Sequence, residues 1–406
     1  MNKRVLLLAG IIAIIAIGIG VLNEQEELVI EETQDESTIP QEEPSETAIV
    51  EEHDTPLRSP KIASWLAKKD ELLQSGKPYD LVMAGWFTPE ESSQFRENNP
   101  DVIILAGLST TWVWDNEDWM SFLVTIANYG RDEPIEITED MYLHKSDGER
   151  CAFGWASEEW AQEEIYAMDP RNENWTRLVI NFYETVLDQP THDGIIVDMV
   201  VEKQYWGQDA ITDEEWMEST NAIYQRMSDL NTEDKLVIFN AGARLTDIDD
   251  YSEYFNGYLM ENFLGDQLQT TFSEGLEAIN GDKIVIYGVD TDDTGTIDLN
   301  KMRLGLVLSL LGDNAYFTYD FGPRDHGQAW WYPEYDVDLG EPIGDYFEKD
   351  GAYWREYEKG VVIAAPNGVS VDFDEEYTDV TSGVTSKNFL IEVGDGRIFL
   401  LNSLTN

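Results

Sequence analysis

The chain has 406 residues, of which 42% are hydrophobic and 12% aromatic, enough for a substantial core in one large domain or two ordinary ones. Its 81 acidic residues against 26 basic ones give a net charge of -55, which makes nucleic acid and anionic lipid poor partners. A role in solubility or in adaptation to high salt explains this negative charge better than binding of a specific cationic ligand does.

Cysteine and histidine usage argues against a metal centre. Cys151 is the only cysteine, so an internal disulfide and a cysteine-based zinc site are excluded, and we expect its side chain to be a small buried hydrophobe. The four histidines show no metal-binding spacing. We therefore predict no metal and no cofactor.

The N-terminus predicts an exported protein. Lys3 and Arg4 precede an unbroken apolar run over residues 5–22, longer than the usual core of a signal peptide and nearly long enough to span a bilayer. Residues 1–23 are therefore either a cleaved signal peptide or, our slight preference, an uncleaved membrane anchor. Residues 24–58 are rich in Glu, Thr, Ser, Pro and Gln, which predicts a disordered acidic linker. We expect the protein to work extracellularly or at the cell surface, touching the membrane only through this N-terminal segment.

The next region alternates short apolar runs with amphipathic, helix-like stretches. The strand-like runs cover residues 79–85, 101–109, 141–146, 194–200, 235–242, 257–263, 283–290 and 314–320. Near-continuous hydrophobicity is typical of parallel strands buried on both faces. This rhythm predicts a (β/α)8 TIM barrel over residues 59–345, with a doubly wound open sheet as the alternative.

The residue pattern of the C-terminal region differs from that of the predicted barrel. A long aromatic and acidic loop follows residue 320, and the segments GVVIAAPNG, GVSVDF, NFLIEV and GRIFLLN then read as short strands joined by Gly and Asn turns. We predict a small antiparallel β appendage over residues 346–406, packed on the barrel.

Two acids close inward-facing runs of the predicted barrel. Asp198 ends GIIVD and shares one face with Ile196, while Glu261 in GYLMENF shares a face with Leu259. Barrel enzymes build their active sites at the carboxyl ends of the strands, so we predict both acids as catalytic. A structural role, such as a salt bridge or a loop cap, is the alternative for each.

Other polar residues follow strand-like runs. His144, Asn240 and Asp320 are predicted to bind substrate, with supporting or loop-anchoring roles equally open. Asp290 is a weaker candidate because it begins a turn rich in acids, and Glu202 is a spare acid beyond the fourth run.

Aromatic clusters follow three of the same runs: TTWVWDNEDW, KQYWGQD and QAWWYPEY. Flat apolar rings beside polar groups are surfaces on which sugar rings stack, although each cluster alone is more often packing. The predicted sugar-binding aromatic residues are Trp112, Trp206, Trp330 and Trp331.

A pair of carboxylates fits glycoside hydrolysis. One carboxylic acid protonates the leaving oxygen, and the other carboxylate attacks the anomeric carbon or activates water. The spacing that separates retention from inversion is not encoded in the sequence pattern, and either acid can take either role.

Residues 61–402 resemble hypothetical glycosyl hydrolase family 15. The resemblance rests on DGIIVDMVVEKQYWG, on GYLMENF, and on GDNAYFTYDFGPRDHGQAWWYPEYDVDLGEP followed by WREYEKGVVIAAPNG. It implies a barrel hydrolase acting on a polysaccharide or glycan. In similar barrel glycosidases an aspartate that ends the fourth strand commonly serves as a catalytic carboxylate, which favours Asp198.

We therefore expect a glycoside hydrolase with a carbohydrate substrate. The alternative is a non-catalytic carbohydrate-binding or cell-envelope protein on a hydrolase-like barrel. A carbohydrate deacetylase is a third possibility, disfavoured because no histidine cluster is present to hold its metal. The sugar, its linkage, endo or exo action and the oligomeric state are left open.

Overall fold

The computed structural model describes residues 58–83, 85–152, 165–231, 235–242, 244–264, 268–291, 294–322 and 329–402. The predicted apolar N-terminal segment and nearly all of the acidic linker lie outside these ranges. Among the described residues no helix is both long and apolar enough to cross a membrane. From Arg58 onward the chain forms one compact unit.

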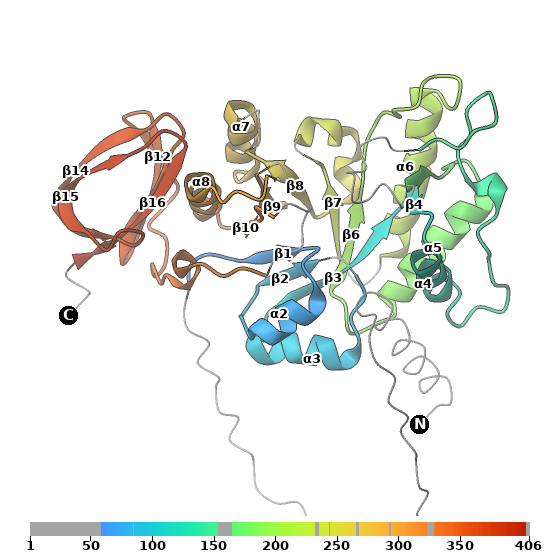
Figure 1. The fold of residues 1–406 in the computed structure, drawn as a ribbon, viewed down its shortest axis with the longest axis horizontal. Helices are drawn as coiled ribbons and strands as arrows, with labels where there is room; N and C mark the ends of the chain where they lie inside the picture. The colour runs from blue at the N-terminus through green and yellow to red at the C-terminus, as the bar shows by residue number, and fades with distance from the viewer. Residues whose placement is uncertain are drawn as a thin grey trace, which may run out of the picture. The chain divides into compact units, whose positions relative to one another are not determined.

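A parallel barrel is the main body (Figure 1). Its strands within the described residues, in sheet order, are β1 (Ala63–Trp65), β2 (Leu81–Met83), β3 (Ile103–Ser109), β6 (Gly194–Asp198), β7 (Leu236–Asn240), β8 (Gly257–Phe263), β9 (Ile284–Val289) and β10 (Ala315–Tyr319). A parallel bridge between Ile62 and Phe317, in which the Phe317 N–H donates to the Lys61 carbonyl at 2.9 Å, joins the two ends of the sheet. The predicted (β/α)8 barrel is therefore confirmed.

Helices follow most of the strands. They are α2 (Lys69–Ser75), α3 (Pro89–Asn98), α4 (Glu117–Ala127), α5 (Glu173–Leu187), α6 (Asp213–Leu230), α7 (Leu268–Ala278) and α8 (Leu299–Leu310), with short 3-10 turns η1 (Glu139–Met141), η2 (Leu245–Asp247), η3 (Asp249–Tyr254) and η4 (Pro333–Asp336). Capping boxes fix two of the helix starts: Thr88 with Glu91 on α3, and Thr212 with Glu215 on α6. These local signals stop each helix-forming stretch from extending back into the loop before it.

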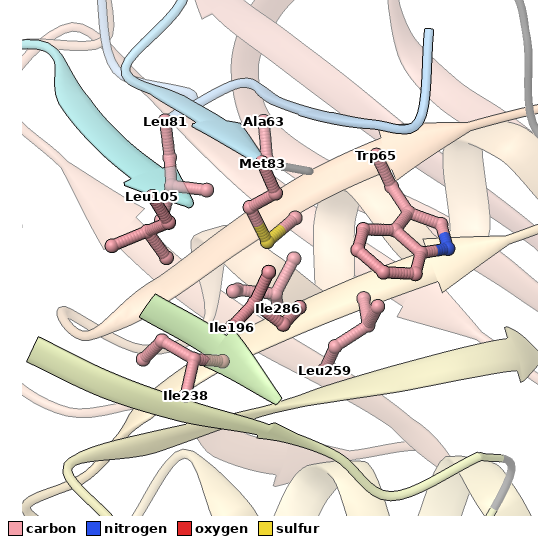
Figure 2. Packing of buried hydrophobic residues seen from close by; sticks show 9 residues of the cluster. All are labelled: Ala63, Trp65, Leu81, Met83, Leu105, Ile196, Ile238, Leu259 and Ile286. Carbon is pink, nitrogen blue, oxygen red and sulfur yellow. The ribbon is translucent and has the colours of Figure 1, made fainter. Parts of the chain in front are cut away.

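The barrel interior is a closed layer of apolar side chains (Figure 2). It is formed by Ala63, Trp65, Leu81, Met83, Leu105, Ile196, Ile238, Leu259 and Ile286. Alternate residues of a strand point to the same face, so the inward set on β6, β7 and β8 continues to Asp198, Asn240 and Glu261 at the carboxyl ends. The interior is packed, and Asp198, Asn240 and Glu261 lie above it at the carboxyl ends of their strands.

The predicted third strand is not part of the barrel. Residues 141–146 lie in a long excursion between β3 and β6, where Tyr142 bridges to Met168 and His144 to Arg150. The same excursion holds the two-stranded sheet of β4 (Trp112–Trp114) and β5 (Ile165–Ala167). The first barrel strand is instead the short β1, which the sequence analysis missed. GIIVD is nevertheless the fourth barrel strand, as predicted. One strand before it was missed, β1, and one was wrongly predicted, residues 141–146, so its place in the strand order is unchanged.

The C-terminal region forms a second, antiparallel sheet, as predicted. Its strands, in sheet order, are β11 (Phe347–Lys349), β12 (Ala352–Tyr357), β13 (Gly360–Ala365), β16 (Asp395–Leu401), β14 (Val369–Asp379) and β15 (Thr385–Ile391). Strand β16 packs closely on α8: a Cβ atom added at Gly396 would lie 2.5 Å from the Arg303 carbonyl oxygen. Glycine at this position therefore permits the contact between sheet and helix.

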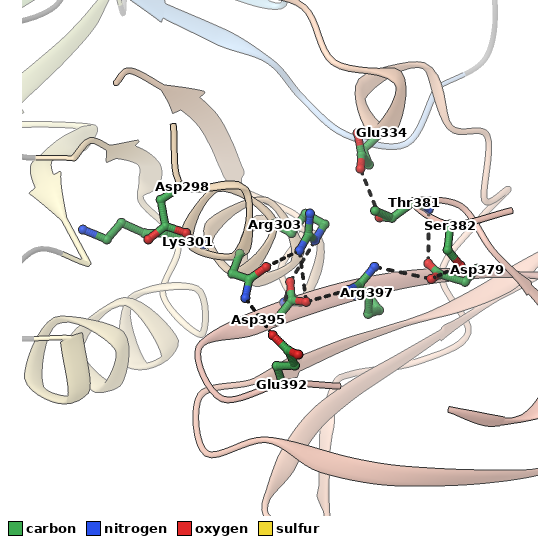
Figure 3. Close-up of polar contacts among 12 residues, drawn as sticks. Asp298, Lys301, Arg303, Glu334, Asp379, Thr381, Ser382, Glu392, Asp395 and Arg397 are labelled. Atoms are coloured by element: carbon green, nitrogen blue, oxygen red, sulfur yellow. Dashed lines mark hydrogen bonds and ion pairs between the residues drawn. The ribbon is translucent and has the colours of Figure 1, made fainter. Parts of the chain in front are cut away.

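A buried ion-pair network reinforces that contact (Figure 3). Asp395, whose side chain is 0% exposed, accepts from Arg303 Nε at 2.8 Å and pairs with Arg397 at 2.9 Å. Arg397 also reaches Asp379 at 3.4 Å. Because a buried charge is costly unless it is paired, the two arginines offset the cost of burying Asp395 at the contact between the sheet and α8.

His192, directly before β6, is a second buried polar group. It is 2% exposed; its Nε2 accepts from the Phe87 N–H at 3.2 Å, and its Nδ1 lies 2.9 Å from the Thr191 hydroxyl. Burial, with a smaller contribution from the positive charges of Lys235 and Arg96, lowers the pKa of His192 to about 3. The ring is thus a neutral part of the core at physiological pH.

Candidate active site

Asp198 is the last residue of β6 and is half-buried at the end of the barrel interior. Its Oδ1 accepts from the backbone N–H of Met199 at 2.9 Å. Met199 has a φ of +57°, a left-handed conformation that a residue with a side chain adopts only at a cost of order 1–2 kcal/mol. The turn after the strand therefore directs a main-chain donor at this carboxylate.

Asn240, the last residue of β7, links two carboxylates. Its Nδ2 lies 2.7 Å from Oδ1 of Asp198 and 2.7 Å from Oε2 of Glu261. Its Oδ1 accepts the N–H of Gly242 at 2.9 Å, which orients the amide with its NH₂ group toward the two acids. Asn240 is 3% exposed, so this orientation is held inside the protein.

Glu261 on β8 receives a further donor from across the barrel. Trp65 Nε1 donates to Oε1 of Glu261 at 2.8 Å. The Trp65 ring belongs to the interior layer and lies near Leu259, the inward residue that precedes Glu261 on β8 (Figure 2). Glu261 thus accepts from Trp65 at Oε1 and from Asn240 at Oε2, and the tryptophan forms part of the apolar layer beneath the carboxylate pair.

The site therefore combines four inward residues at the carboxyl ends of four strands. Asp198, Asn240 and Glu261 are predicted site residues, whereas Trp65 was not predicted from the sequence. The segment IASW was a detectable signal, being a short apolar run before the amphipathic stretch of α2. Its three-residue strand is shorter than the runs by which the other strands were recognised.

Other predicted acids lie around the same end. Asp290 follows β9 and is buried. Asp320 follows β10, where its Oδ1 accepts the N–H of Gly322 at 2.7 Å and so shapes the loop. Glu202 accepts the N–H of Asp250 at 2.7 Å and connects two loops.

His144 is placed away from the barrel sheet, in the excursion. Its Nε2 lies 2.9 Å from Oε1 of Glu139, to which Arg150 Nε also donates at 2.9 Å. Hydrogen bonds from Arg150 and then His144 lower the pKa of Glu139 to about 2. This cluster connects parts of the excursion, and the structure does not bring His144 together with the carboxylate pair.

The predicted tryptophans occupy three kinds of environment. Trp112 is buried, and Trp206 is half-buried, in one apolar cluster that also includes Met199 and Val201 of the loop after Asp198. Trp330 is 36% exposed and stacks on Phe321, with ring centroids 3.8 Å apart, just after β10.

Trp331 lies apart from the site. It contacts Tyr79 edge-on at 5.3 Å between ring centroids, and the charged groups of Lys77 and Arg58 each lie 5.4 Å from its ring. Residues 77–79 precede β2, so this tryptophan packs at the amino end of the barrel, opposite the carboxylates. The rings of the adjacent residues Trp330 and Trp331 therefore pack on different neighbours, Phe321 after β10 and Tyr79 before β2.

A metal site is not evident at this end. Within the described ranges no group of three or more His, Cys, Asp or Glu side chains is arranged to hold a metal ion.

The sequence matches a known family. The profile described as "Hypothetical glycosyl hydrolase family 15" matches residues 96–361, which include Asp198, Asn240 and Glu261 but not Trp65. No curated protein matches the chain.

Several solved structures resemble the fold at low identity. A noncanonic maltogenic alpha-amylase from Thermotoga neapolitana is 10% identical, with a TM-score of 0.46 over 85% of this chain and 96% of that chain. The debranching enzyme of Nostoc punctiforme is 11% identical, with a TM-score of 0.44 over 82% and 88%. The glycoside hydrolase domain of PelA from Pseudomonas aeruginosa is 11% identical, with a TM-score of 0.42 over 66% and 96%. Because these TM-scores are below 0.5, the likenesses do not assign an activity.

Proposed function

The chain belongs to hypothetical glycosyl hydrolase family 15, and on this premise we propose that Asp198 and Glu261 hydrolyse the O-glycosidic bonds of a polysaccharide or glycan. The observation that carries the proposal is the Asn240 side chain, which donates to both carboxylates at 2.7 Å. The shared amide holds the two acids close together at the carboxyl end of the barrel, where barrel enzymes build their active sites.

The chemistry needs both groups. In glycoside hydrolysis one carboxylic acid protonates the leaving oxygen while a carboxylate supports the anomeric carbon by attack or by activating water. Hydrogen bonds from Met199, Asn240 and Trp65 hold the two carboxyl groups in fixed positions, which removes part of the entropic cost of reaching the transition state.

Trp330 is our proposed sugar-stacking residue. It is the most exposed of the four predicted tryptophans, and its stacking on Phe321 keeps the ring in one plane beside the end of β10. A rigid flat ring loses little freedom when a sugar ring packs on it. Trp330→Ala should raise KM for a polymeric substrate with little change in kcat, and an unchanged KM would remove this residue from the proposal.

We also propose that the enzyme acts outside the cytoplasmic membrane. The support is the basic start and the apolar run over residues 5–22. Digestion of the protein by a protease added to intact cells tests this location, and complete protection until the cells are lysed would contradict it.

The activity is tested with matched carboxamide variants. The purified protein is incubated with a panel of α- and β-linked polysaccharides, including starch, dextran, xylan and chitosan, and released reducing ends are measured. Asp198→Asn should abolish release, and Glu261→Gln should lower it by about 10²–10⁴-fold. The control is Glu218→Gln, which changes an exposed carboxylate on the outside of α6 and should retain activity.

Two results would contradict the proposal. Retained turnover by Asp198→Asn would remove Asp198 from the chemistry. Binding of a glycan by the unaltered protein without cleavage of any member of the panel would favour the non-catalytic carbohydrate-binding alternative.

A further inference from the structure

The shared amide of Asn240 limits the distance between the two carboxylates. Oδ1 of Asp198 and Oε2 of Glu261 each lie 2.7 Å from the same nitrogen. The two oxygens therefore cannot be farther apart than twice that distance, ~5.4 Å. Retaining glycosidases place their carboxyl groups about 5–5.5 Å apart, whereas inverting enzymes need about 6.5–9.5 Å to admit a water molecule.

The protein holds this short spacing from several sides. The Asn240 amide is anchored at its oxygen by the Gly242 N–H, Asp198 is anchored by the Met199 N–H, and Glu261 is anchored by Trp65. Asn240 and Trp65 are both buried. Opening the gap enough for an attacking water would break at least one of these bonds inside the protein, where replacing it is costly.

We propose, on the basis of the proposed hydrolase function, that the reaction proceeds with retention through a glycosyl ester on Asp198, with Glu261 as acid and then base and with Asn240 and Trp65 as positioning residues. The ester is assigned to Asp198 because one of its donors is a main-chain N–H, whose fixed position stabilises the carboxylate before the ester forms and again after the ester is hydrolysed. Asn240 and Trp65 donate to Glu261 through side chains, which can adjust as that group gains and loses a proton.

Atoms and electrons balance in both steps of the proposed reaction, formation of the ester and its hydrolysis. In the first, an oxygen of Asp198 bonds to the anomeric carbon while the glycosidic C–O bond breaks, and the leaving oxygen takes the proton of Glu261. In the second, a water oxygen bonds to the anomeric carbon, Glu261 takes a proton from that water, and the ester bond breaks with its electron pair returning to Asp198. The net change is hydrolysis, with both carboxyl groups restored.

The stereochemistry is tested by NMR. The polysaccharide that the panel shows to be cleaved is digested in the spectrometer, and the anomeric proton signals of the product are followed before mutarotation. The first product should have the same anomeric configuration as the cleaved linkage. The opposite configuration would overturn retention and leave the hydrolase function standing, whereas no cleavage of any polysaccharide would overturn the function itself.

The assignment of roles is tested by azide rescue on 2,4-dinitrophenyl glycosides of the sugar released in the panel. With Glu261→Ala, azide should restore turnover at least tenfold and give a glycosyl azide of unchanged configuration, because it attacks the ester on Asp198. With Asp198→Ala, azide should occupy the vacated space and give the opposite configuration. The reverse pattern would assign the ester to Glu261 and overturn the proposal.

The positioning role of Asn240 has its own readout. Asn240→Ala should lower kcat with little change in KM, and in the presence of a 2-fluoro aryl glycoside it should accumulate the ester on Asp198 more slowly than the unaltered protein, as measured by peptide mass. Labelling at an unchanged rate would show that Asn240 has only a structural role.

Discussion

The indole N–H of Trp65 donates to the carboxylate of Glu261 at 2.8 Å, although 196 residues separate the two in the chain. In the barrel order, β10 and β9 lie between their strands, β1 and β8. The indole therefore reaches across the barrel mouth and joins strands that are not neighbours. Replacing the indole by a phenyl ring removes the N–H donor and keeps an aromatic ring at this position.

Trp65→Phe should lower kcat by about 10- to 100-fold, because a hydrogen bond to a charged group is worth about 1.5–3 kcal/mol. Loss of the donor disfavours the ionised carboxylate, so the alkaline limb of the pH–rate profile should move to higher pH. The matched control is Trp331→Phe, which also removes an indole N–H that donates to a carboxylate, Asp336 at 2.9 Å, but at the amino end of the barrel. Equal losses of activity in both variants would contradict a specific role for Trp65.

Asn240→Asp should remove activity and make stability depend on pH. The new carboxylate would lie beside two others, and the repulsion makes the folded protein hold a proton that the unfolded chain releases. A group that binds its proton more tightly when folded stabilises the fold at low pH and loses that effect as pH rises. The melting temperature of Asn240→Asp, minus that of Asn240→Ala, should therefore be larger at pH 5 than at pH 8. A difference in melting temperature that does not change with pH would contradict this.

Asp395→Asn should destabilise the protein by about 3–5 kcal/mol, because it leaves the buried Arg303 without its counter-charge. The urea midpoint, followed by tryptophan fluorescence, measures the loss. Asp372→Asn, an exposed change on the same sheet, should shift stability by no more than about 0.5 kcal/mol. Equal midpoints for the two variants would show that the ion pair does not hold the sheet on α8.

His192→Gln tests the neutral buried imidazole. Because burial lowers its pKa to about 3, the fold is stabilised by the neutral form above the unfolded value near 6.5, and this stabilisation is lost as pH falls from about 6.5 toward 3. The unaltered protein should lose up to about 1.4 kcal/mol per pH unit more than the variant in that window. Urea titrations at pH 7, 6, 5 and 4 measure the difference, and a constant difference would place the charged form of His192 in the native state.

The barrel could be predicted from the sequence because its strands are apolar on both faces. Such strands can be recognised as apolar runs even when the pairing register between strands is unknown. Residues 141–146 have the same apolar character because Leu143 is buried in the excursion, so composition alone could not separate them from a barrel strand. Strand β1 was missed because Ser64 interrupts its short apolar segment, whereas β2, also three residues long, lies in the longer apolar run of residues 79–85.

The predicted site shows a similar division. Asp198, Asn240 and Glu261 could be placed at one end of the barrel by parity along their strands. The Trp65 bond could not, because it depends on closure between the first and last strands. Trp330 and Trp331 were predicted together, yet their rings pack on different neighbours: Trp330 on Phe321, after β10, and Trp331 on Tyr79, before β2.

The closure of the barrel between β1 and β10 has a consequence for how proteolysis near the N-terminus would affect activity. The donor to Glu261 stands on the strand beside this joint, three residues from Ile62, whose bridge to Phe317 completes the ring of strands. A chain proteolysed after Trp65 keeps Asp198, Asn240 and Glu261 in its sequence, yet it lacks the indole that donates to Glu261. Cleavage of the linker before Ile62 would leave in place both this indole and the residue whose bridge to Phe317 closes the barrel.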